Sequence, residues 1–282
     1  MDWQTLASKL FPGGHDIVEH DSFLSGSGQV DAGAGADAAA RTVAVIGTTG
    51  HAPIGIEIAL AQAQAVLRTV REHPGRAILI LVDTQGQRLR HRDEMLGINS
   101  YMAHLGKCID FARRQGHTVL GLVYDQALSG GFITSGLIAD ACFALPQATI
   151  RVMGLPAMAR ITKVPEDRLT ELAMDNPVFA PGAENYLRMG GLQAIWEPGP
   201  GVESTDAAAI SLPDASANAS ANSSASASAN SSASALASAL AKALAQVEPT
   251  DRRMALGEAR GGRHMAQAVA QAVRTGGDVR PA

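Results

Sequence analysis

Apolar residues along the chain form short continuous runs that alternate with longer stretches of helical spacing. The runs TVAVIG, AILILV and VLGLVY begin at residues 42, 77 and 119. Each is followed by a glycine-bearing turn and then by a segment in which apolar positions recur every three or four residues. Continuous apolar runs of this length are typical of strands covered on both faces. The alternation therefore predicts an α/β domain whose parallel strands are joined by helical crossovers.

Two segments between these runs are predicted to be amphipathic helices. In IGIEIALAQAQAVLRTVRE (54–72), the positions at helical spacing are Ile58, Ala61, Ala65 and Val66. A second helix is expected to start at HRDEMLGIN (91–99), and its apolar face would comprise Met95, Ile98, Tyr101, Met102, Leu105, Cys108, Ile109 and Ala112. Two more short strands are expected at ACFAL (141–145) and TIRVM (149–153).

The remaining segments suggest how the chain is divided. The stretch SFLSGSGQVDAGAGADAAA (22–40) is glycine- and alanine-rich, so it is predicted to be loop, with order beginning at Arg41. Residues 155–200 are expected to form a peripheral helical segment, and the Ser/Ala/Asn tract has too little apolar bulk for a core. ALASALAKALAQV and RHMAQAVAQAVRTG are predicted to be helices. The resulting segments are an N-terminal extension or loop (1–40), the principal domain (41–200), a low-complexity linker or disordered loop (201–234) and C-terminal helices (235–282).

Composition narrows the cellular setting. The formal net charge of −4 gives no general attraction to nucleic acid or to an anionic membrane. The only two cysteines, Cys108 and Cys142, lie in apolar surroundings and suit reduced core thiols better than a disulfide. No apolar run approaches the roughly 18 residues of a membrane helix, and MDWQTLASKLF does not resemble a targeting segment. A cytoplasmic protein is expected.

Several motifs with familiar chemistry do not fit their required spacing. HDIVEH (15–20) is neither H-E-x-x-H nor H-x-x-E-H, so a polar helix or loop is favoured over zinc, and no metal is expected. HRDEMLGIN has one residue too many before Asn99 for a kinase catalytic loop. GSGQVDAG lacks the strand-before and helix-after context of a dinucleotide loop. Ser129 is not framed as G-x-S-x-G, so a role as a hydrolase nucleophile is open but disfavoured.

The turn QALSGGFITSG (126–136) is the strongest candidate site. Gly130 and Gly131 stand where a buried strand turns into a helix, and the first N–H groups of a helix lack helical acceptors. Without a Cβ, this backbone allows close approach of a substrate oxygen, and the helix dipole favours negative charge there. The turn therefore fits an oxyanion hole made from main-chain N–H groups. The alternative is that both glycines only permit close packing of helix on strand.

A neighbouring turn offers a second donor and a set of arginines. DTQG (83–86) ends the preceding strand, so the N–H of Gly86 or Gln87 is expected to face the SGG turn across the strand ends. Arg88, Arg90 and Arg92 follow in QRLRHRD, and their guanidinium groups suit phosphate or carboxylate groups. A solvated loop with surface ion pairs is the alternative.

These motifs resemble a known family. GTTGHAPIGIEIALAQAQAV, LVDTQG and QALSGGFITSGLIADACFALPQATIRVMG are similar, in this order, to the carboxyltransferase branch of the crotonase superfamily, and most to the gamma subunits of biotin-independent malonate decarboxylases. The resemblance is strong over residues 41–200, weaker over the final helices, and absent from the Ser/Ala/Asn tract. Gln85 stands where biotin-dependent relatives usually have proline, which affects the shape of the turn that carries Gly86.

The resemblance implies a crotonase-like ββα superhelix and a heterodimer with a homologous beta subunit. It implies decarboxylation of a malonyl thioester to an acetyl thioester on an acyl carrier protein whose prosthetic group derives from dephospho-CoA. By analogy, Gly130 and Gly131 with Gly86 or Gln87 would hold a carbonyl or carboxylate oxygen, and Ser129, Arg88, Arg90 and Arg92 would bind substrate. Two alternatives stay open: the alpha half of a biotin-dependent acyl-CoA carboxyltransferase, and a scaffold subunit without catalytic residues.

Overall fold

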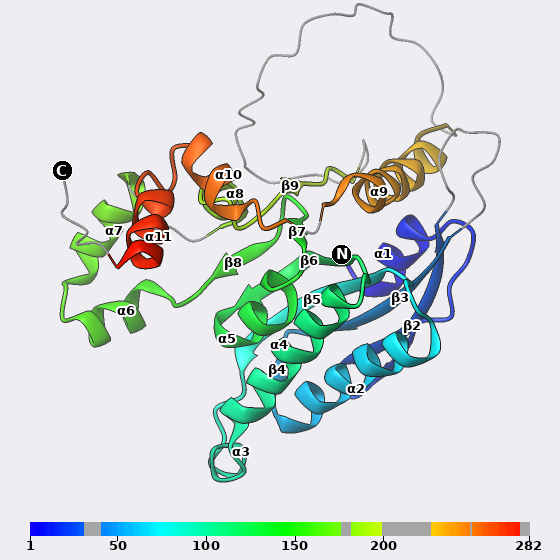
Figure 1. Cartoon of the computed structure of the whole chain (residues 1–282), viewed down its shortest axis with the longest axis horizontal. Coiled ribbons are helices and arrows are strands. Elements are labelled where there is room, and N and C mark those ends of the chain that lie inside the picture. The colour runs from blue at the N-terminus through cyan, green and yellow to red at the C-terminus, as the bar shows by residue number, and fades with distance from the viewer. Residues whose placement is uncertain (31–40, 176–181, 199–226, 249, 277–282) are drawn as a thin grey trace, which may run out of the picture.

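One mixed sheet organises the computed structural model, which describes residues 1–30, 41–175, 182–198, 227–248 and 250–276. The strand order is β1-β2-β3-β5-β6-β7-β9, with β4 paired to β5 and β8 paired to β6 (Figure 1). β1 and β2 are antiparallel to their neighbours, and all other pairs are parallel. The strands are β1 (Val18–His20), β2 (Phe23–Val30), β3 (Arg41–Thr48), β4 (Ala52–Ile54), β5 (Ile78–Gln87), β6 (Val119–Leu128), β7 (Ala141–Ala144), β8 (Thr149–Arg151) and β9 (Ala194–Ile195).

The continuous apolar strands are buried on both faces, as their sequence predicts. Successive side chains point to opposite faces of a strand, so Ile46 and Ile80 pack against one layer of helices while Val45 and Leu79 pack against the other. The first layer is α2 (Ile56–Glu72) and α4 (Ile98–Arg114), and the second is α1 (Trp3–Leu10) and α9 (Ala227–Gln246), as Figure 1 shows. The predicted α/β architecture with parallel pairing is therefore confirmed for the central strands.

Both predicted helices of the first layer exist, but their details differ from the prediction. The buried residues of α2 are Ile56, Ala59, Gln62, Ala63, Val66 and Thr69. Of the residues predicted for this face, only Val66 is among them. The second helix is two helices, α3 (His91–Met95) and α4, separated at Gly97, whose φ of 75° is left-handed. Because of this break Met95 is 73% exposed, contrary to its predicted place on the buried face.

The N-terminal segment corrects the loop prediction. Residues 23–30 are strand β2, paired along its whole length with β3 from Phe23↔Thr48 to Val30↔Arg41. Order therefore begins before Arg41, and HDIVEH contributes strand β1 rather than a helix. The reason is a contact with a residue distant in sequence: Gly28 lies directly beneath the ring of Phe11, at the end of α1. Glycine weakens an isolated strand, but here the absence of a Cβ lets α1 pack across β2. Residues 31–40 lie outside the described part of the chain.

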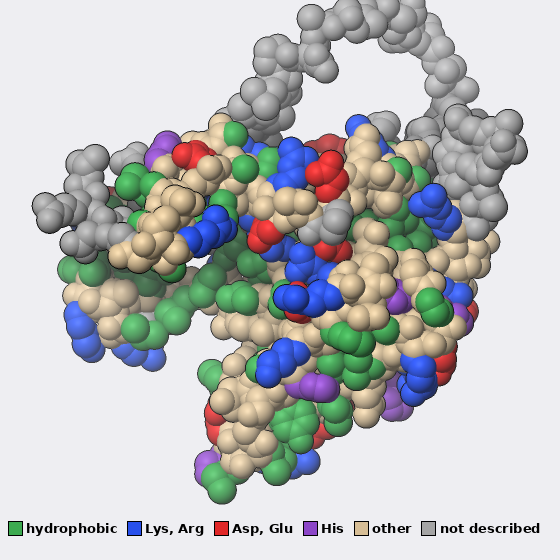
Figure 2. Space-filling view, viewed as in Figure 1, with side chains coloured by type: hydrophobic (Ala, Val, Ile, Leu, Met, Phe, Trp, Pro, Cys, Tyr) green, Lys and Arg blue, Asp and Glu red, His purple; other side chains and the backbone are tan. Residues whose placement is uncertain are grey.

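After β8 the chain forms peripheral helices, as predicted for residues 155–200. They are α6 (Leu155–Thr162), α7 (Glu166–Asp175) and α8 (Ala183–Arg188), after which β9 returns to the sheet. Figure 2 shows hydrophobic side chains gathered on the outlying lobe formed by α6, α7 and α11, where Val152, Met153 and Ile161 are exposed.

The C-terminal helices are α9, α10 (Arg253–Ala259) and α11 (Ala266–Thr275), of which α10 was not predicted. Arg260 joins them to the sheet domain by donating hydrogen bonds to the carbonyls of Leu187, Leu192 and Gln193. Within the Ser/Ala/Asn tract, residues 227–234 belong to α9, and the linker prediction for 201–226 falls outside the described residues. Cys108 and Cys142 are buried free thiols, as predicted. Among the described helices, none is long and apolar enough to cross a membrane.

Candidate functional site at the carboxyl ends of the strands

The DTQG turn of β5 and the SGG turn after β6 pack directly against each other. A Cβ added to Gly86 would lie 2.9 Å from the carbonyl oxygen of Leu128 and 2.9 Å from the Cβ of Ser129. A Cβ added to Gly131 would lie 3.0 Å from the Cα and carbonyl carbon of Gly86. A Cβ on Gly86 would be closer than real Cβ contacts are, and a Cβ on Gly131 would force its neighbours to shift by a few tenths of an ångström. The prediction that the two turns meet across the strand ends is thus observed.

The SGG turn starts a short helix that continues in a wider register. α5 (Ser129–Phe132) leads into the π-helix η1 (Ile133–Leu137), and Ser129 has a φ of 53°, a strained value for a residue with a side chain. The carbonyls of Gly130 and Gly131 accept hydrogen bonds from the hydroxyls of Thr134 and Ser135, at 2.9 and 2.7 Å. Both carbonyls therefore point along the helix, and the N–H groups of its first turn point away from it.

The two glycines of the turn differ in their surroundings. A Cβ on Gly131 would meet backbone, as described above, whereas a Cβ on Gly130 would meet only the Oε1 atom of Gln87, at 3.7 Å. Gly131 therefore fits the close-packing alternative raised by the sequence. Gly130 borders open space beside the side chain of Gln87, and packing gives no reason for the absence of its Cβ.

The hydrogen bonds around the DTQG turn favour Gln87 over Gly86 as the second candidate donor. The N–H of Gly86 donates to the Oγ1 of Thr84 at 2.9 Å, and that hydroxyl donates to the carbonyl of Ala52 at 2.6 Å. The next amide along, that of Arg88, donates to the carbonyl of Ile54 in β4. Consecutive N–H groups of an extended strand point to opposite sides, so the N–H of Gln87 points away from β4, toward the side of β6 and the SGG turn. Of the two donors considered, Gly86 is excluded by its own hydrogen bond.

The turn keeps its shape although Gln85 stands where biotin-dependent relatives usually have proline. The pairing of β4 with β5 passes from Ala52↔Thr84 to Pro53↔Gly86, so Gln85 is skipped as a bulge and its side chain is exposed. Gly86, with a φ of 97°, supplies the left-handed conformation after it. The close approach of the two turns therefore forms without proline.

The three arginines after the turn belong to a network of ion pairs. The guanidinium of Arg88 binds both oxygens of Asp93, at 2.6 and 2.9 Å, and also contacts Glu57. Asp93 is fully buried, and the hydrogen bonds from Arg88 lower the pKa of its carboxyl. Arg92 also binds Glu57, and Arg90 lies 3.4 Å from Asp93. Arg88 thus ties the loop to the first turn of α2.

Exposure separates the three guanidinium groups. The side chain of Arg88 is 24% exposed, whereas those of Arg90 and Arg92 are 49% and 56% exposed. All three arginines form ion pairs, as the alternative from the sequence expects, and Arg88 is the one most completely occupied by them. Arg90 and Arg92 keep about half of their surface free for an anion.

Acid is expected to loosen this network. The hydrogen bond from Arg92 is the largest cause that lowers the pKa of Glu57 to about 2 from its ordinary 4.5. A carboxyl whose pKa falls on folding stabilises the protein above its unfolded pKa, and that contribution is lost as the pH drops from about 4.5 toward 2. We expect Glu57→Gln to lower stability at pH 6 by on the order of 1 kcal/mol or less, because the pair is half exposed.

Urea unfolding of both proteins at pH 6, 4 and 3 measures this effect. The difference in unfolding free energy between wild type and Glu57→Gln should shrink as the pH falls. A difference that stays constant from pH 6 to pH 3 would contradict a contribution from the ionised carboxylate.

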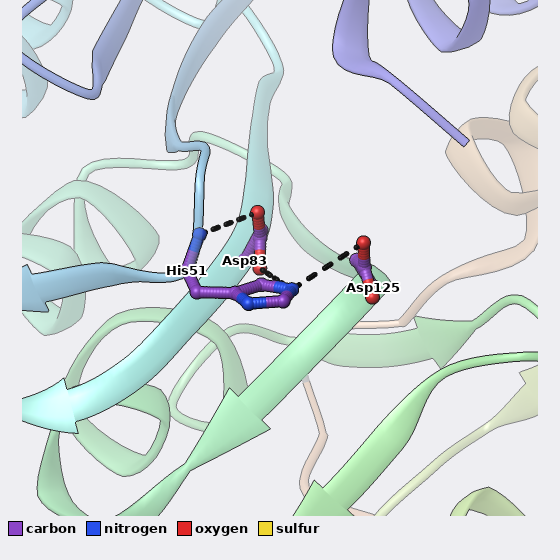
Figure 3. A group of neighbouring side chains, drawn as sticks. All are labelled: His51, Asp83 and Asp125. Atoms are coloured by element: carbon purple, nitrogen blue, oxygen red, sulfur yellow. Dashed lines mark hydrogen bonds and ion pairs between the residues drawn. The ribbon is translucent and has the colours of Figure 1, made fainter.

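A second group of polar side chains gathers at the same edge of the sheet and was not foreseen from the sequence. His51 follows β3, Asp83 lies in β5 and Asp125 lies in β6, and one potential ligand atom from each lies within 4.8 Å of the others (Figure 3). A signal was present, since each residue comes just after one of the three apolar strand runs. The search for linear His motifs missed it, because the three residues are brought together only by parallel pairing.

A surface pocket lies away from these turns. Its lining includes Arg41 at the start of β3, His73 and Arg76 in the turn between α2 and β5, and Thr118 just before β6. Ligand sites of parallel sheets form at the carboxyl ends of the strands, so the two turns are better candidates for the functional site than this pocket.

Comparisons with known proteins agree with the motifs. Residues 49–277 match the family model described as malonate decarboxylase gamma subunit. A curated relative, the malonyl-S-ACP:biotin-protein carboxyltransferase MADD of Malonomonas rubra, is 34% identical over 160 residues, which are 54% of this chain and 55% of the relative. The chain thus spans about half the length of that relative.

Solved structures show the same fold. A Pseudomonas malonate decarboxylase hetero-tetramer in complex with coenzyme A has a TM-score of 0.68 at 24% identity, covering 96% of both chains. The Pseudomonas MdcD-MdcE hetero-dimer has a TM-score of 0.67 at 24% identity, covering 96% of this chain and 97% of that one. The transcarboxylase 12S hexamer core has a TM-score of 0.57 at 18% identity, covering 70% of this chain and 38% of the other. The predicted crotonase-like carboxyltransferase fold is confirmed.

Proposed function

The chain belongs to the malonate decarboxylase gamma subunit family, and from this premise we propose that it forms one half of a carboxyltransferase-type enzyme that decarboxylates a malonyl thioester. The other half is a homologous beta subunit, and the thioester is carried by an acyl carrier protein with a dephospho-CoA-derived prosthetic group. Residues 41–200 form the carboxyltransferase half-domain, completed by the N-terminal strands. The assembly acts in the cytoplasm, in keeping with its reduced thiols.

The chemistry needs a place for developing negative charge. The bond between C2 of the malonyl group and its carboxylate breaks, CO2 leaves, and the electron pair forms an enolate whose charge rests on the thioester oxygen. A proton then adds to C2 and gives the acetyl thioester. Donors that bind the enolate oxygen more strongly than the neutral carbonyl accelerate this step. Each well-placed donor typically contributes a factor of about 10²–10³ in kcat.

One observation carries the proposal: the turn at the end of β5 and the turn after β6 pack directly against each other at the carboxyl ends of the strands. In the proposed pocket, the donors are the N–H groups of Gly130 and Gly131 at the start of α5 and the N–H of Gln87 at the end of β5. Gly86 and Gly131 allow the two turns to touch, and Gly130 leaves room for the substrate oxygen. Ser129 holds the strained turn and borders the same space.

The arginine loop would hold the anionic parts of the substrate. Arg90 and Arg92, each about half exposed, fit the phosphate of the prosthetic group or the malonyl carboxylate. Arg88 is assigned to positioning, because its guanidinium is already bound to two carboxylates. The exposed hydrophobic residues near α6 supply a surface for the beta subunit.

A biotin-dependent carboxyltransferase is the second candidate. It is favoured by the 34% identity to a relative named as a malonyl-S-ACP:biotin-protein carboxyltransferase. In that case the carboxyl group would pass to biotin on a separate protein instead of leaving as CO2.

Reconstitution tests both candidates. We expect the beta subunit together with this chain to release CO2 from a malonyl-carrier-protein thioester on the order of 10²-fold faster than the beta subunit alone, because the pocket is completed by both halves. Release of 14CO2 from labelled substrate measures the rate. No gain over the beta subunit alone would contradict the proposal. Loss of the activity on adding avidin would favour the biotin-dependent candidate instead.

A further inference from the structure

We infer that His51, Asp83 and Asp125 form a binding site for a divalent first-row transition-metal ion such as Mn²⁺ or Zn²⁺. The group lies at the same edge of the sheet as the SGG turn but includes no residue of that turn, and the inference does not depend on the proposed decarboxylation. Its three ligands combine one imidazole with two carboxylates, a set that suits ions between the hard alkaline-earth metals and the soft thiolate-binding ones.

The separations between the three side chains fit a bridging ion. The Nε2 atom of His51 lies 3.6 Å from the Oδ1 of Asp83 and 3.6 Å from the Oδ2 of Asp125 (Figure 3). Both distances exceed those of ordinary hydrogen bonds, which are about 2.7–3.2 Å. Two ligands bound about 2.1 Å from one ion at a tetrahedral angle are about 3.4 Å apart. The imidazole and the two carboxylates are therefore spaced as ligands rather than as hydrogen-bond partners.

The charges in the group also call for a cation. The Asp83 side chain is 3% exposed, and a buried carboxylate needs a positive partner. In the part of the chain that the structure describes, His51 is the only basic side chain within 4 Å of either Asp83 or Asp125. A divalent ion would balance two carboxylates, which one imidazole does not.

The backbone holds the ligands in place before any ion arrives. The N–H of His51 donates to the Oδ2 of Asp83 at 2.9 Å, and the Oδ1 atom accepts a longer hydrogen bond from the N–H of Gln126 at 3.4 Å while facing the imidazole. His51 adopts a φ of 50°, a strained value for a residue with a side chain. This fixed carboxylate orientation is the kind of support that metal ligands usually receive from their surroundings.

The exposure of the group allows an ion to enter and keep water ligands. The side chains of His51 and Asp125 are 52% and 42% exposed, while Asp83 forms the buried floor. Three protein ligands with open positions toward solvent are the arrangement of sites that retain bound water. The ion would join the ends of three neighbouring parallel strands, β3, β5 and β6.

Binding of Mn²⁺ to the full chain tests the inference. The protein is first stripped with a chelator, and bound Mn²⁺ is counted by electron paramagnetic resonance, with Zn²⁺ as competitor. We expect one Mn²⁺ per chain, displaced by Zn²⁺, and a dissociation constant raised at least about tenfold by His51→Gly or Asp125→Asn. His51→Gly suits the left-handed φ of this position and Asp125→Asn keeps the side-chain shape, so both variants should fold.

A matched pair elsewhere serves as control. His20 and Asp21 are 88% and 95% exposed and lie 3.8 Å apart, and among the described residues they belong to no group of three potential ligands. The variant His20→Ala should bind Mn²⁺ as the wild type does. Mn²⁺ should also raise the midpoint of thermal unfolding in the wild type and in His20→Ala, but not in the two site variants. The absence of saturable binding of Mn²⁺ or Zn²⁺ to the wild type, or equal affinities in wild type and His51→Gly, would overturn the inference.

Discussion

Gly130→Ala is expected to lower the decarboxylation rate of the assembled complex by about 10²-fold, while the stability of the chain stays unchanged. The added Cβ has room, since its nearest neighbour is the Oε1 of Gln87 at 3.7 Å. It would occupy the space where the substrate oxygen is proposed to approach the N–H groups, and a displacement of about 1 Å at a reacting centre can cost about 10²-fold. The measurement is kcat for CO2 release together with the unfolding midpoint.

Gly154→Ala is the matched control for this prediction. Gly154 also stands at the start of a helix, and its added Cβ would make an ordinary contact of 3.8 Å with Pro156. Turnover of this variant should equal that of the wild type. If Gly130→Ala also turned over at the wild-type rate in an intact complex, the oxyanion role would fail and the scaffold alternative would be favoured.

Gly86→Ala is expected to destabilise the chain by about 2–5 kcal/mol, the sum of two effects. Alanine at a φ of 97° carries backbone strain of about 1–2 kcal/mol. Its Cβ would also meet the carbonyl oxygen of Leu128 at 2.9 Å, and such overpacking typically costs about 1–3 kcal/mol. Because Leu128 contributes backbone atoms, relief requires the two turns to separate, so activity should fall with stability.

Gly75→Ala is the control that measures the cost of backbone strain without the cost of a close contact. Gly75 has a φ of 76°, but an added Cβ would find nothing within 4 Å. Its substitution should therefore cost only the strain, about 1–2 kcal/mol. Urea unfolding of the two variants gives the comparison. Equal losses for Gly86→Ala and Gly75→Ala would contradict the close contact between the turns.

The central strands and the SGG turn could be predicted because their signals are local. A continuous apolar run such as AILILV is typical of a strand buried on both faces, and paired glycines at a strand end indicate close packing or the close approach of a substrate. The meeting of DTQG with LSGG followed from the parallel order of the strands, since adjacent carboxyl ends share one edge.

Two predictions made from local sequence patterns were wrong. Phe11 makes Gly28 suitable for a strand, although glycine-rich sequence alone indicates loop. Met95 was assigned to a buried face because its spacing fits, but the left-handed turn at Gly97 interrupts the helix and exposes it. At Gly28 a contact from a distant residue outweighed the local composition, and at Met95 a left-handed glycine two residues further along interrupted the helical spacing.

The sequence by itself determined the α/β core, the family and the turns from which the candidate site is made. Only the tertiary structure decided how the backbone of the DTQG turn is engaged: Thr84 accepts a hydrogen bond from the N–H of Gly86, and this favours the N–H of Gln87 as the proposed second donor. It also decided that Arg88 is bound to Asp93, and that His51 meets Asp83 and Asp125. The physical reason is that hydrogen bonds and ion pairs depend on a few tenths of an ångström between residues far apart in sequence, whereas strand and helix patterns depend on neighbours.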